Sequence, residues 1–255
     1  MNIIGMLASA VGGYLIGSIS SARIVTSLFG QKNIVPEETT LGIEGSEKKI
    51  VTKLVSATTV STNVGPKFGF MTYVLDVLKV FIPAYLLRRY YPDSQLYLIF
   101  ATTGVVGHIW PIYHKFRGGR GISAIYGGIF AFDWLAVFVG AISGLIFGLI
   151  ILRDLYLTYT IGLLFLVPWF WFRTHDPYII LYIIIVNILL NISALPESRQ
   201  WYKIKKEAKW NDPAQAFQIS AMGRGIIKMA RKLGFFKEQD SLSDPKTKQK
   251  SQDES

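Results

Sequence analysis

The segment that spans residues 115–123 carries the strongest signal for chemistry in this sequence. It contains three glycines within four positions and two arginines, and an apolar stretch follows it directly. Glycines let backbone N–H groups converge on an anion, and arginines add charge with a fork of donors. A helix that begins at about Ile122 would also favour negative charge at its N-terminus. The segment therefore predicts a phosphate site, with a tight basic turn as the alternative. Its candidate residues are Lys115, Arg117, Gly118, Gly119, Arg120, Gly121 and Ser123.

Two opposite charges, Asp76 and Lys79, lie inside an apolar stretch and are three residues apart. This spacing places them on one face of a helix. Charges within a membrane span are costly and usually functional, but pairing with each other would lower the cost and allow a purely structural role. Arg23 lies near the end of the first apolar stretch. Its long side chain could extend to the lipid headgroups or reach a phosphate.

Small and amide side chains recur at helical spacing in the later apolar stretches. The glycines at positions 140, 144 and 148 repeat every four residues, which predicts close contact between two helices. Asn187 and Asn191 share one face of the last stretch. They either join helices through hydrogen bonds or contact a substrate.

The elements that must position these residues are apolar helices. A bilayer core needs about 20 apolar residues per helix, and seven stretches come near that length. The fourth is too short alone and could run into the fifth, with Phe132 and Asp133 as a turn, so six spans is an alternative to seven. The stretches are Ile3–Phe29, Phe68–Leu87, Leu96–Tyr113, Ile122–Ala131, Trp134–Leu152, Leu155–Phe172 and Pro177–Leu195.

Composition supports an all-α, polytopic integral membrane protein. Of the 255 residues, 51% are hydrophobic and only 17% are charged, whereas a soluble domain carries about 25% charged residues. The first stretch is predicted to be a span, because no basic residue precedes it and it is too long for a signal peptide. The chain has no cysteine, which excludes disulfides, thiolate metal sites and thioester-forming cysteines.

The distribution of positive charge predicts the orientation in the membrane. With seven spans, 22 basic residues fall on one side and three, at positions 88, 89 and 173, fall on the other. Positive charge marks the cytoplasmic side. The N-terminus is therefore predicted outside and the C-terminus inside. Because topology accounts for the net charge of +10, no nucleic-acid partner is needed to explain it.

The chain divides into a membrane domain and a polar tail. Residues 1–196 form the predicted membrane domain, which includes a long cytoplasmic connection over residues 30–67. In residues 197–238, apolar residues alternate spacings of three and four beside basic ones, as in a helix on an anionic membrane surface. The alternative is a helix packed on the protein's own cytoplasmic face. Residues 239–255 are predicted to be disordered.

Several catalytic motifs are absent from the sequence. No histidine is followed five residues later by an aspartate, so the His-Asp acyltransferase motif is missing. The sequence also has no Walker loop, HExxH or GxSxG motif. Neither a nucleophile–base pair nor a set of metal ligands can be recognised from the order of residues, and no metal or cofactor is expected.

Four segments carry a resemblance to a known family. Gly17–Ile19, Leu75–Lys79, Gly107–Pro111 and Lys115–Gly121 resemble the bacterial acyl-phosphate:glycerol-3-phosphate acyltransferases of the PlsY type. The resemblance covers roughly residues 10–195. It implies a seven-span enzyme of the bacterial cytoplasmic membrane, with membrane lipids around it and its active face in the cytoplasm. Such an enzyme moves a fatty acyl group from acyl phosphate to glycerol 3-phosphate and forms lysophosphatidic acid, without acyl-CoA or a metal.

The family's first and third motifs match this chain only in part. The family's first motif is matched by Ser56, Thr62, Asn63 and Val64, but its arginine has no counterpart, and Lys67 or Arg23 would have to replace it. In the third motif Asn191, Ile192 and Leu195 match, while Ile188 and Ala194 occupy the histidine and arginine positions. The resemblance implies catalytic roles for Ser56, His108, Arg120 and Asn191, and adds Thr62, Asn63, Lys67 and Arg23 to the phosphate-binding residues.

Three functions remain open from the sequence. Acyl transfer to glycerol 3-phosphate is the main prediction. The departures in the first and third motifs also fit a catalytically impaired or repurposed member that binds lipid or acyl phosphate, or acylates another acceptor. A small transporter is a third possibility, against which stand the few charges in the spans and the absence of an obviously broken helix.

Overall fold

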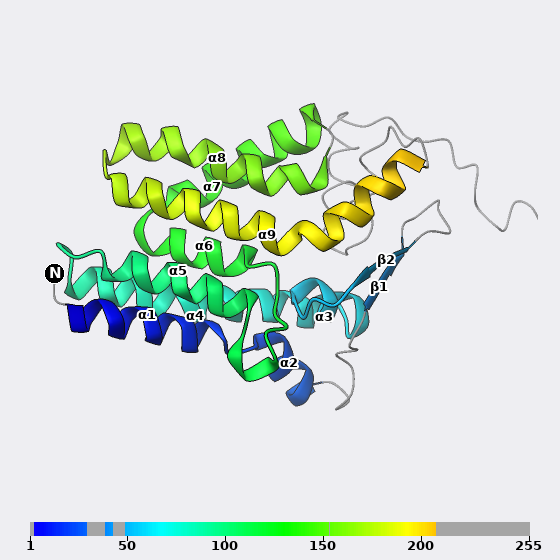
Figure 1. Ribbon diagram of the computed structural model, residues 1–255, viewed down its shortest axis with the longest axis horizontal. Coiled ribbons are helices and arrows are strands. Elements are labelled where there is room, and N and C mark those ends of the chain that lie inside the picture. Colours follow the sequence, from blue (N-terminus) through cyan, green and yellow to red (C-terminus); the bar gives the residue numbers. More distant parts are fainter. Residues whose placement is uncertain (1–2, 30–38, 43–48, 153, 208–255) are drawn as a thin grey trace, which may run out of the picture.

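The computed structural model describes residues 3–29, 39–42, 49–152 and 154–207, and this part of the chain is a helical bundle with one short hairpin (Figure 1). The all-α prediction is therefore confirmed for most of it. The elements are α1 Ile3–Gly17, α2 Ser21–Phe29, β1 Thr39–Gly42, β2 Lys49–Thr52, α3 Ala57–Asn63, α4 Pro66–Tyr90, α5 Leu96–Ile109, the 3₁₀ turn Ile112–His114, α6 Ile122–Phe132, α7 Trp134–Ser143, the π-helix Gly144–Ile151, α8 Leu155–Arg173 and α9 Pro177–Glu207.

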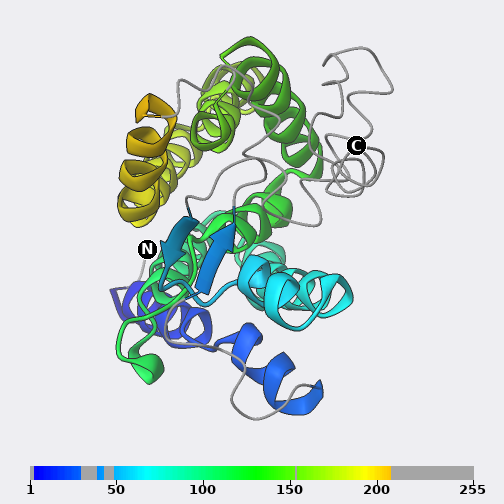
Figure 2. The ribbon, with the colours of Figure 1, turned by 90° about the vertical axis from the view of Figure 1, so that its right-hand side faces the viewer.

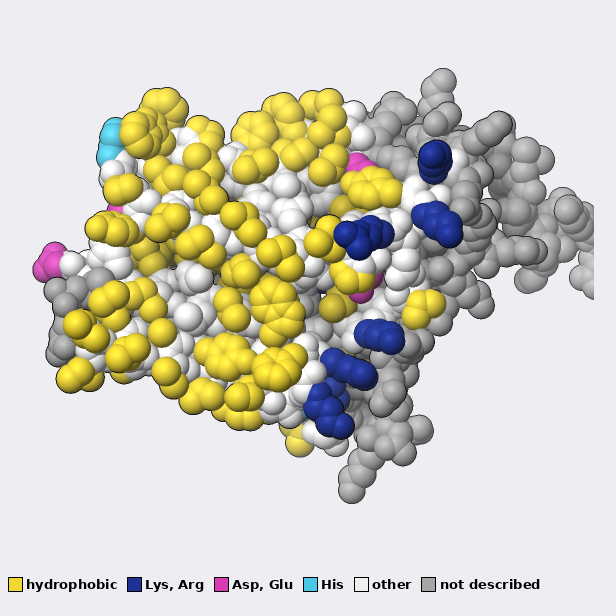
Figure 3. Space-filling model, in the orientation of Figure 1, with side chains coloured by type: hydrophobic (Ala, Val, Ile, Leu, Met, Phe, Trp, Pro, Cys, Tyr) yellow, Lys and Arg dark blue, Asp and Glu magenta, His cyan; other side chains and the backbone are white. Residues whose placement is uncertain are grey.

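The helices pack in two groups around α6, with α1, α4 and α5 on one side and α7, α8 and α9 on the other (Figure 1). The core between them is apolar and includes the fully buried Val105, Ile129, Leu166 and Ile183. The outer faces of the long helices are also apolar, as Figure 3 shows over most of the length of the bundle. Apolar faces on both sides of a helix are expected where lipid replaces water.

Four helical segments among the described residues are long and apolar enough to cross a membrane. These segments are Ile3–Phe29, Pro66–Tyr90, Leu96–His114 and Pro177–Lys203. The apolar helix α6 has 11 residues, or about 16 Å at 1.5 Å per residue, roughly half of a bilayer core. Its shortness agrees with the prediction that the fourth stretch cannot span alone, and seven spans remain a prediction.

Aspartate caps separate the later helices. Asp133 follows α6, and its Oδ1 accepts hydrogen bonds from the N–H groups of Leu135 and Ala136 at 2.9 and 3.3 Å. The side chain thus satisfies donors that the first turn of α7 leaves unpaired. Asp154 caps α8 in the same way, through the N–H groups of Tyr156 and Leu157. The sequence offered a turn at residues 132–133 as one alternative, and the structure places the boundary between α6 and α7 at Asp133.

The first apolar stretch is broken, which the sequence did not predict. α1 ends at Gly17 and α2 begins at Ser21, and α2 turns away from the direction of α1 (Figures 1 and 2). Ser18 donates its hydroxyl to the Tyr14 carbonyl at 2.7 Å, and the Ser20 hydroxyl accepts from the Arg23 N–H at 3.4 Å. Such side-chain bonds to the backbone compete with a continuous helix. The expectation that no helix is broken was therefore wrong.

Glycines bring α7 and the following π-helix against α8, as the four-residue repeat predicts. A Cβ on Gly144 would lie 2.4 Å from the Thr158 carbonyl oxygen, and one on Gly148 would lie 2.3 Å from the Thr158 Cα. From the other side, a Cβ on Gly162 would lie 2.3 Å from the Gly140 carbonyl oxygen. The predicted packing role of this stripe is confirmed.

The connection predicted as a polar loop contains α3 and an antiparallel pair, β1 and β2. Strand β2 docks on α9, because the Gln200 amide accepts from the Val51 N–H at 3.1 Å and donates to the Val51 carbonyl at 3.0 Å. Beside it, the Thr52 hydroxyl donates to Glu197 Oε1 at 2.9 Å. Helix α9 thus continues through Pro196 and ends beyond the predicted last span, at Glu207.

The polar tail lies mainly outside the described residues. Its described part, residues 197–207, belongs to α9. The predicted amphipathic helix over the rest of 197–238 and the predicted disorder of 239–255 stay predictions.

Candidate functional site

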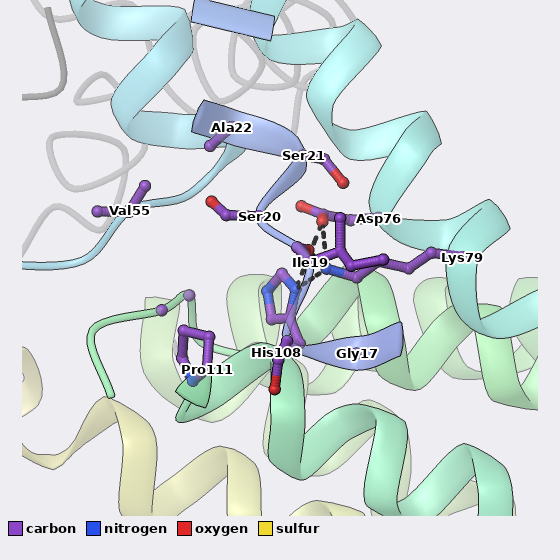
Figure 4. A pocket seen from close by; sticks show the side chains of 13 residues that line it. Gly17, Ile19, Ser20, Ser21, Ala22, Val55, Asp76, Lys79, His108 and Pro111 are labelled. Carbon is purple, nitrogen blue, oxygen red and sulfur yellow. Dashed lines mark hydrogen bonds and ion pairs between the residues drawn. The ribbon is translucent and has the colours of Figure 1, made fainter. Parts of the chain in front are cut away.

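A cavity lies where α1 breaks from α2, against the middle of α4, the end of α5 and the glycine segment (Figure 4). Five parts of the chain meet there, so the broken helix and the glycine segment belong to one site. The cavity is lined by Gly17, Ser18, Ile19, Ser20, Ser21, Ala22, Val55, Asp76, Lys79, His108, Pro111, Gly118 and Gly119.

A buried ionic network forms one wall of this cavity. Lys79 Nζ lies 2.8 Å from Asp76 Oδ1, 2.7 Å from the Ile19 carbonyl oxygen and 3.0 Å from His108 Nδ1. The side chains are nearly inaccessible, with 3% of Asp76, 10% of Lys79 and 7% of His108 exposed. The predicted pair of Asp76 and Lys79 is confirmed, and His108 joins it as a third member (Figure 4). Lys79 also satisfies a carbonyl group that the break after α1 frees.

The glycine segment packs directly on His108. The Gly119 N–H donates to the His108 carbonyl at 3.1 Å, and the Gly118 carbonyl accepts from the Val55 N–H at 3.0 Å. A Cβ on Gly118 would lie 2.1 Å from the His108 carbonyl oxygen, and one on Gly119 would lie 2.5 Å from His108 Nε2. The Gly119 N–H therefore already has a carbonyl partner, which is a correction for this one donor, and the anion site itself stays a prediction.

The turn after these glycines begins a helix as predicted. Gly121 has φ +93°, a conformation that favours glycine, and α6 starts at Ile122. Ser123 is buried in its first turn. The segment thus combines the predicted helix start with close backbone packing.

The basic residues of the segment do not gather at the cavity. The Arg120 guanidinium carbon lies 5.3 Å from the centre of the Tyr156 ring of α8. Its Nε is buried and has no hydrogen-bond partner among the described residues. Lys115 and Arg117 are exposed, as is Lys67 in the first turn of α4. The predicted cluster of Arg117 and Arg120 around the glycines is therefore divided between the surface and α8.

Arg23 lies in the first turn of α2, directly after Ala22, which lines the cavity. Its Nε is buried, and no described residue accepts a hydrogen bond from it. Arg23 is thus a partly buried cation close to the break, and its phosphate contact stays a prediction.

The polar side chains of the first motif form hydrogen bonds with the backbone of α3. Ser56 is the N-cap of α3 and accepts from the Thr59 N–H at 3.4 Å. The Thr62 hydroxyl donates to the Thr58 carbonyl, and the Asn63 amide donates to the Thr59 carbonyl, both at 3.0 Å. None of these three side chains lines the cavity, although the neighbouring Val55 does.

The asparagines of the last helix join α9 to α8. Asn191 Oδ1 accepts from the Thr160 hydroxyl at 3.1 Å, and its Nδ2 donates to Asn187 Oδ1 at 2.7 Å. Asn187 Nδ2 in turn donates to the Thr160 carbonyl at 2.9 Å. Of the two alternatives from the sequence, the structure places both side chains in interhelical hydrogen bonds.

Two residues of α9 near the site were missed in the sequence. The Ser193 hydroxyl donates to the Arg120 carbonyl at 2.9 Å, so α9 holds the glycine segment. Glu197 is buried, and its Oε2 has no hydrogen-bond partner among the described residues. Their spacing of four residues, which places both on one face of α9, is the signal that could have indicated them.

Comparison with known proteins identifies the family. The family model described as "Glycerol-3-phosphate acyltransferase" matches residues 7–200. The chain belongs to the glycerol-3-phosphate acyltransferase family. The resemblance carried by the motifs is confirmed. Within this family, His108, Lys79 and the glycine segment all fall inside the matched region.

Curated relatives in the glycerol-3-phosphate acyltransferase family are similar over part of their length. Glycerol-3-phosphate acyltransferase from Legionella pneumophila (strain Corby) is 35% identical over 123 residues, which cover 48% of this chain and 40% of the relative. The same-named proteins of Hydrogenobaculum sp. and Mycoplasma mobile are 36% and 32% identical, over 50% and 55% of this chain and 58% and 54% of theirs. The chain spans about half the length of the curated relatives it matches.

Solved structures support the fold of this family member. Two crystal structures of PlsY (YgiH), an integral membrane glycerol 3-phosphate acyltransferase, superpose with a TM-score of 0.63. One is described as the lysophosphatidic acid form and the other as the glycerol 3-phosphate form. They are 20% identical to this chain and cover 81% of it and 94% of the PlsY chain. The likeness shows that the chain has the fold of an integral membrane protein.

Proposed function

We propose that this family member transfers a fatty acyl group from acyl phosphate to glycerol 3-phosphate and forms lysophosphatidic acid. The observation that carries the proposal is the buried Lys79–His108 network under the Gly118–Gly119 segment, at the polar end of an apolar bundle. Both substrates bring a phosphate, and a buried cation beside a glycine-rich turn suits such a group. The apolar outer faces suit the acyl chain.

The chemistry requires placement rather than an acid–base relay of the protein. The glycerol hydroxyl oxygen attacks the acyl carbonyl carbon, a new C–O bond forms, and the bond from that carbon to the phosphate oxygen breaks. Phosphate leaves with the electron pair and can take up the hydroxyl proton. The protein would hold the two phosphates, offset their charge, and orient the hydroxyl towards the carbonyl. Arg23 and Arg120 are the candidates for this task, because each has a buried Nε without a hydrogen-bond partner among the described residues.

We also propose that the polar end of the bundle faces the bacterial cytoplasm, with the N-terminus outside and seven spans. In support, Lys and Arg side chains gather at that end on the face shown in Figure 3, and positive charge favours the cytoplasmic side. Because the chain has no cysteine, single cysteines report topology cleanly. A cysteine at Asp93 should react with an impermeant maleimide in intact cells, whereas one at Arg199 should react only after lysis. The reverse pattern would overturn this orientation.

A second candidate function is binding without acyl transfer, or transfer to another acceptor. It is favoured because Ser56, Thr62 and Asn63 bond to the backbone around α3 and Asn191 bonds to α8. Two side chains that the resemblance marks as catalytic, Ser56 and Asn191, are thus engaged in structure. The chain also lacks the arginine and histidine that the first and third motifs have in the family.

Purified protein in detergent distinguishes the two functions. Acyl phosphate with glycerol 3-phosphate should give lysophosphatidic acid and an equal amount of free phosphate, and acyl-CoA should not replace acyl phosphate. Protein that binds acyl phosphate but forms no lysophosphatidic acid would favour the second candidate. Transfer from acyl-CoA alone would refute the proposed donor.

A further inference from the structure

Lys79 has as many close polar neighbours among the described residues as an ammonium group has donors. An ammonium has three N–H donors and no acceptor. Its three close oxygen and nitrogen neighbours are Asp76 Oδ1, the Ile19 carbonyl oxygen and His108 Nδ1, at 2.8, 2.7 and 3.0 Å. Each neighbour must therefore accept. Asp76 balances the charge of Lys79, the Ile19 carbonyl gains the donor that the helix break removed, and His108 Nδ1 accepts the third N–H.

The contact with Lys79 determines where the proton of His108 lies. Because Lys79 can only donate, the ring nitrogen that faces it must be the bare one, and the proton is carried by Nε2. An imidazolium would direct a second positive N–H group at the ammonium. Asp76 Oδ1 is 3.4 Å from Nδ1, farther than its 2.8 Å distance to Lys79 Nζ, so the carboxylate serves mainly the lysine.

The protonated nitrogen of His108 faces the glycine segment. A Cβ on Gly119 would lie 2.5 Å from Nε2 and 3.3 Å from the two adjoining ring carbons, so the edge of the ring that carries Nε2 lies against this glycine. Figure 4 shows the imidazole of His108 next to the ion pair of Asp76 and Lys79. His108, Gly118 and Gly119 all line the cavity. Any side chain at position 119 would cover the donor.

We propose that Lys79 is a positioning residue that keeps His108 as the Nε2–H tautomer, so that His108 donates a hydrogen bond to a substrate phosphate oxygen in this cavity. The proposal deepens the proposed acyltransferase function and rests on it for the identity of the phosphate. The phosphate belongs to either acyl phosphate or glycerol 3-phosphate, which share this chemistry. The neutral imidazole of His108 then donates the hydrogen bond to the phosphate, while Lys79 keeps its bond to the Ile19 carbonyl at the helix break.

Nitrogen NMR of histidine tests the tautomer without relying on turnover. The chain has three histidines, so ¹⁵N-histidine labelling gives few signals, and the variants His114→Gln and His175→Gln assign them. In the parent at pH 7.5 we expect His108 to show a bare Nδ1 and a protonated Nε2. In Lys79→Met, and in Asp76→Asn/Lys79→Met if the single variant does not fold, Nδ1 should gain proton occupancy. Nδ1 protonated in the parent, or an unchanged tautomer in a folded variant, overturns the proposal.

Arg88→Met is the matched control. Arg88 is a second cation of α4, and it donates to the carbonyl groups of Ala131 and Phe132, far along the helix from the cavity. Its loss should leave the His108 tautomer unchanged. A tautomer change in this variant equal to that in Lys79→Met would show that general loosening of α4, and not the contact with Lys79, is responsible.

Two ligand arms identify the phosphate. Glycerol 3-phosphate and a non-hydrolysable acyl phosphonate are titrated separately, and one of them should shift the Nε2 resonance of the parent. The Asp76→Asn/Lys79→Met variant should bind that ligand at least about tenfold more weakly, as expected for one lost hydrogen bond to a charged group, with KM for that substrate raised more than kcat is lowered. A resonance that neither ligand moves overturns the proposal. A shift without any lysophosphatidic acid formation would refute the proposed function and still support this one.

Discussion

Replacing Lys79 tests whether the in-membrane charges form one unit. Lys79→Met keeps the length and apolar stem of the side chain but removes the ammonium. Asp76, whose side chain is 3% exposed, then keeps His108 as a neighbour at 3.4 Å. Removing one partner of a buried ion pair costs about 3–5 kcal/mol. Because His108 can partly replace the lysine, we expect a loss near the lower limit, about 3 kcal/mol.

The double variant Asp76→Asn/Lys79→Met should be more stable than Lys79→Met alone. It removes the stranded carboxylate, so the remaining loss is the Ile19 carbonyl without a donor, about 1–3 kcal/mol. Reversible unfolding in mixed detergent, followed by far-UV circular dichroism, measures both free energies of unfolding. A double variant that is less stable than Lys79→Met, or a Lys79→Met loss below about 1 kcal/mol, would refute the account of these charges as a coupled pair.

Three further predictions concern packing around the site. Gly118→Ala should lower the free energy of unfolding by about 2 kcal/mol. Its Cβ would lie 2.1 Å from the His108 carbonyl oxygen, and the backbone bonds from Gly119 to His108 and from Val55 to Gly118 would be lost. In the same denaturation assay the control Gly12→Ala, whose Cβ would meet only Phe100 at 3.8 Å, should be at least as stable as the parent. Asn191→Ala should cost about 1–2 kcal/mol without weakening phosphate binding in a calorimetric titration, and weaker binding with normal stability would restore a substrate role for this side chain. Gln200→Leu removes the acceptor of the Val51 N–H, so amide hydrogen exchange of Val51 should become about tenfold faster while exchange in α8 is unchanged. The control Ser198→Ala, which loses a bond to the Leu195 carbonyl, should leave exchange of Val51 and of α8 unchanged.

Sequence periodicity predicted the helices well because apolar stretches and turn residues both act locally. The aspartate that separates α6 from α7 and the glycine stripe that packs on α8 were both readable from spacing alone. The break after α1 was not, because hydropathy is high on both sides of it. The break depends on Ser18 and on the α5 backbone, since a Cβ on Gly17 would lie 2.2 Å from the Gly104 carbonyl oxygen. Contacts between distant segments of this kind carry no local signal.

The site shows the same division between local and distant information. The spacing of three residues predicted the pair of Asp76 and Lys79, and the glycines predicted a special turn. That the turn would use its Gly119 N–H on the His108 carbonyl could not be read from composition. The contact of Arg120 with the Tyr156 ring could not be predicted either, because an arginine beside glycines is compatible with both a surface turn and a buried aromatic contact. Resemblance to a family supplied His108, and the structure supplied its partner.

The docking of β2 on α9 also sets an order for assembly. The bonds between Val51 and Gln200 join residues 149 positions apart, and those between Thr52 and Glu197 join residues 145 apart. A growing chain emerges from its N-terminus, so the hairpin, α3 and the glycine segment exist long before their support does. The strand can find its final partners only after the last helix has been synthesised and inserted. Docking of the hairpin on α9 is therefore a late, non-local step of folding. A chain that ends before α9 would lack the residues that bind β2.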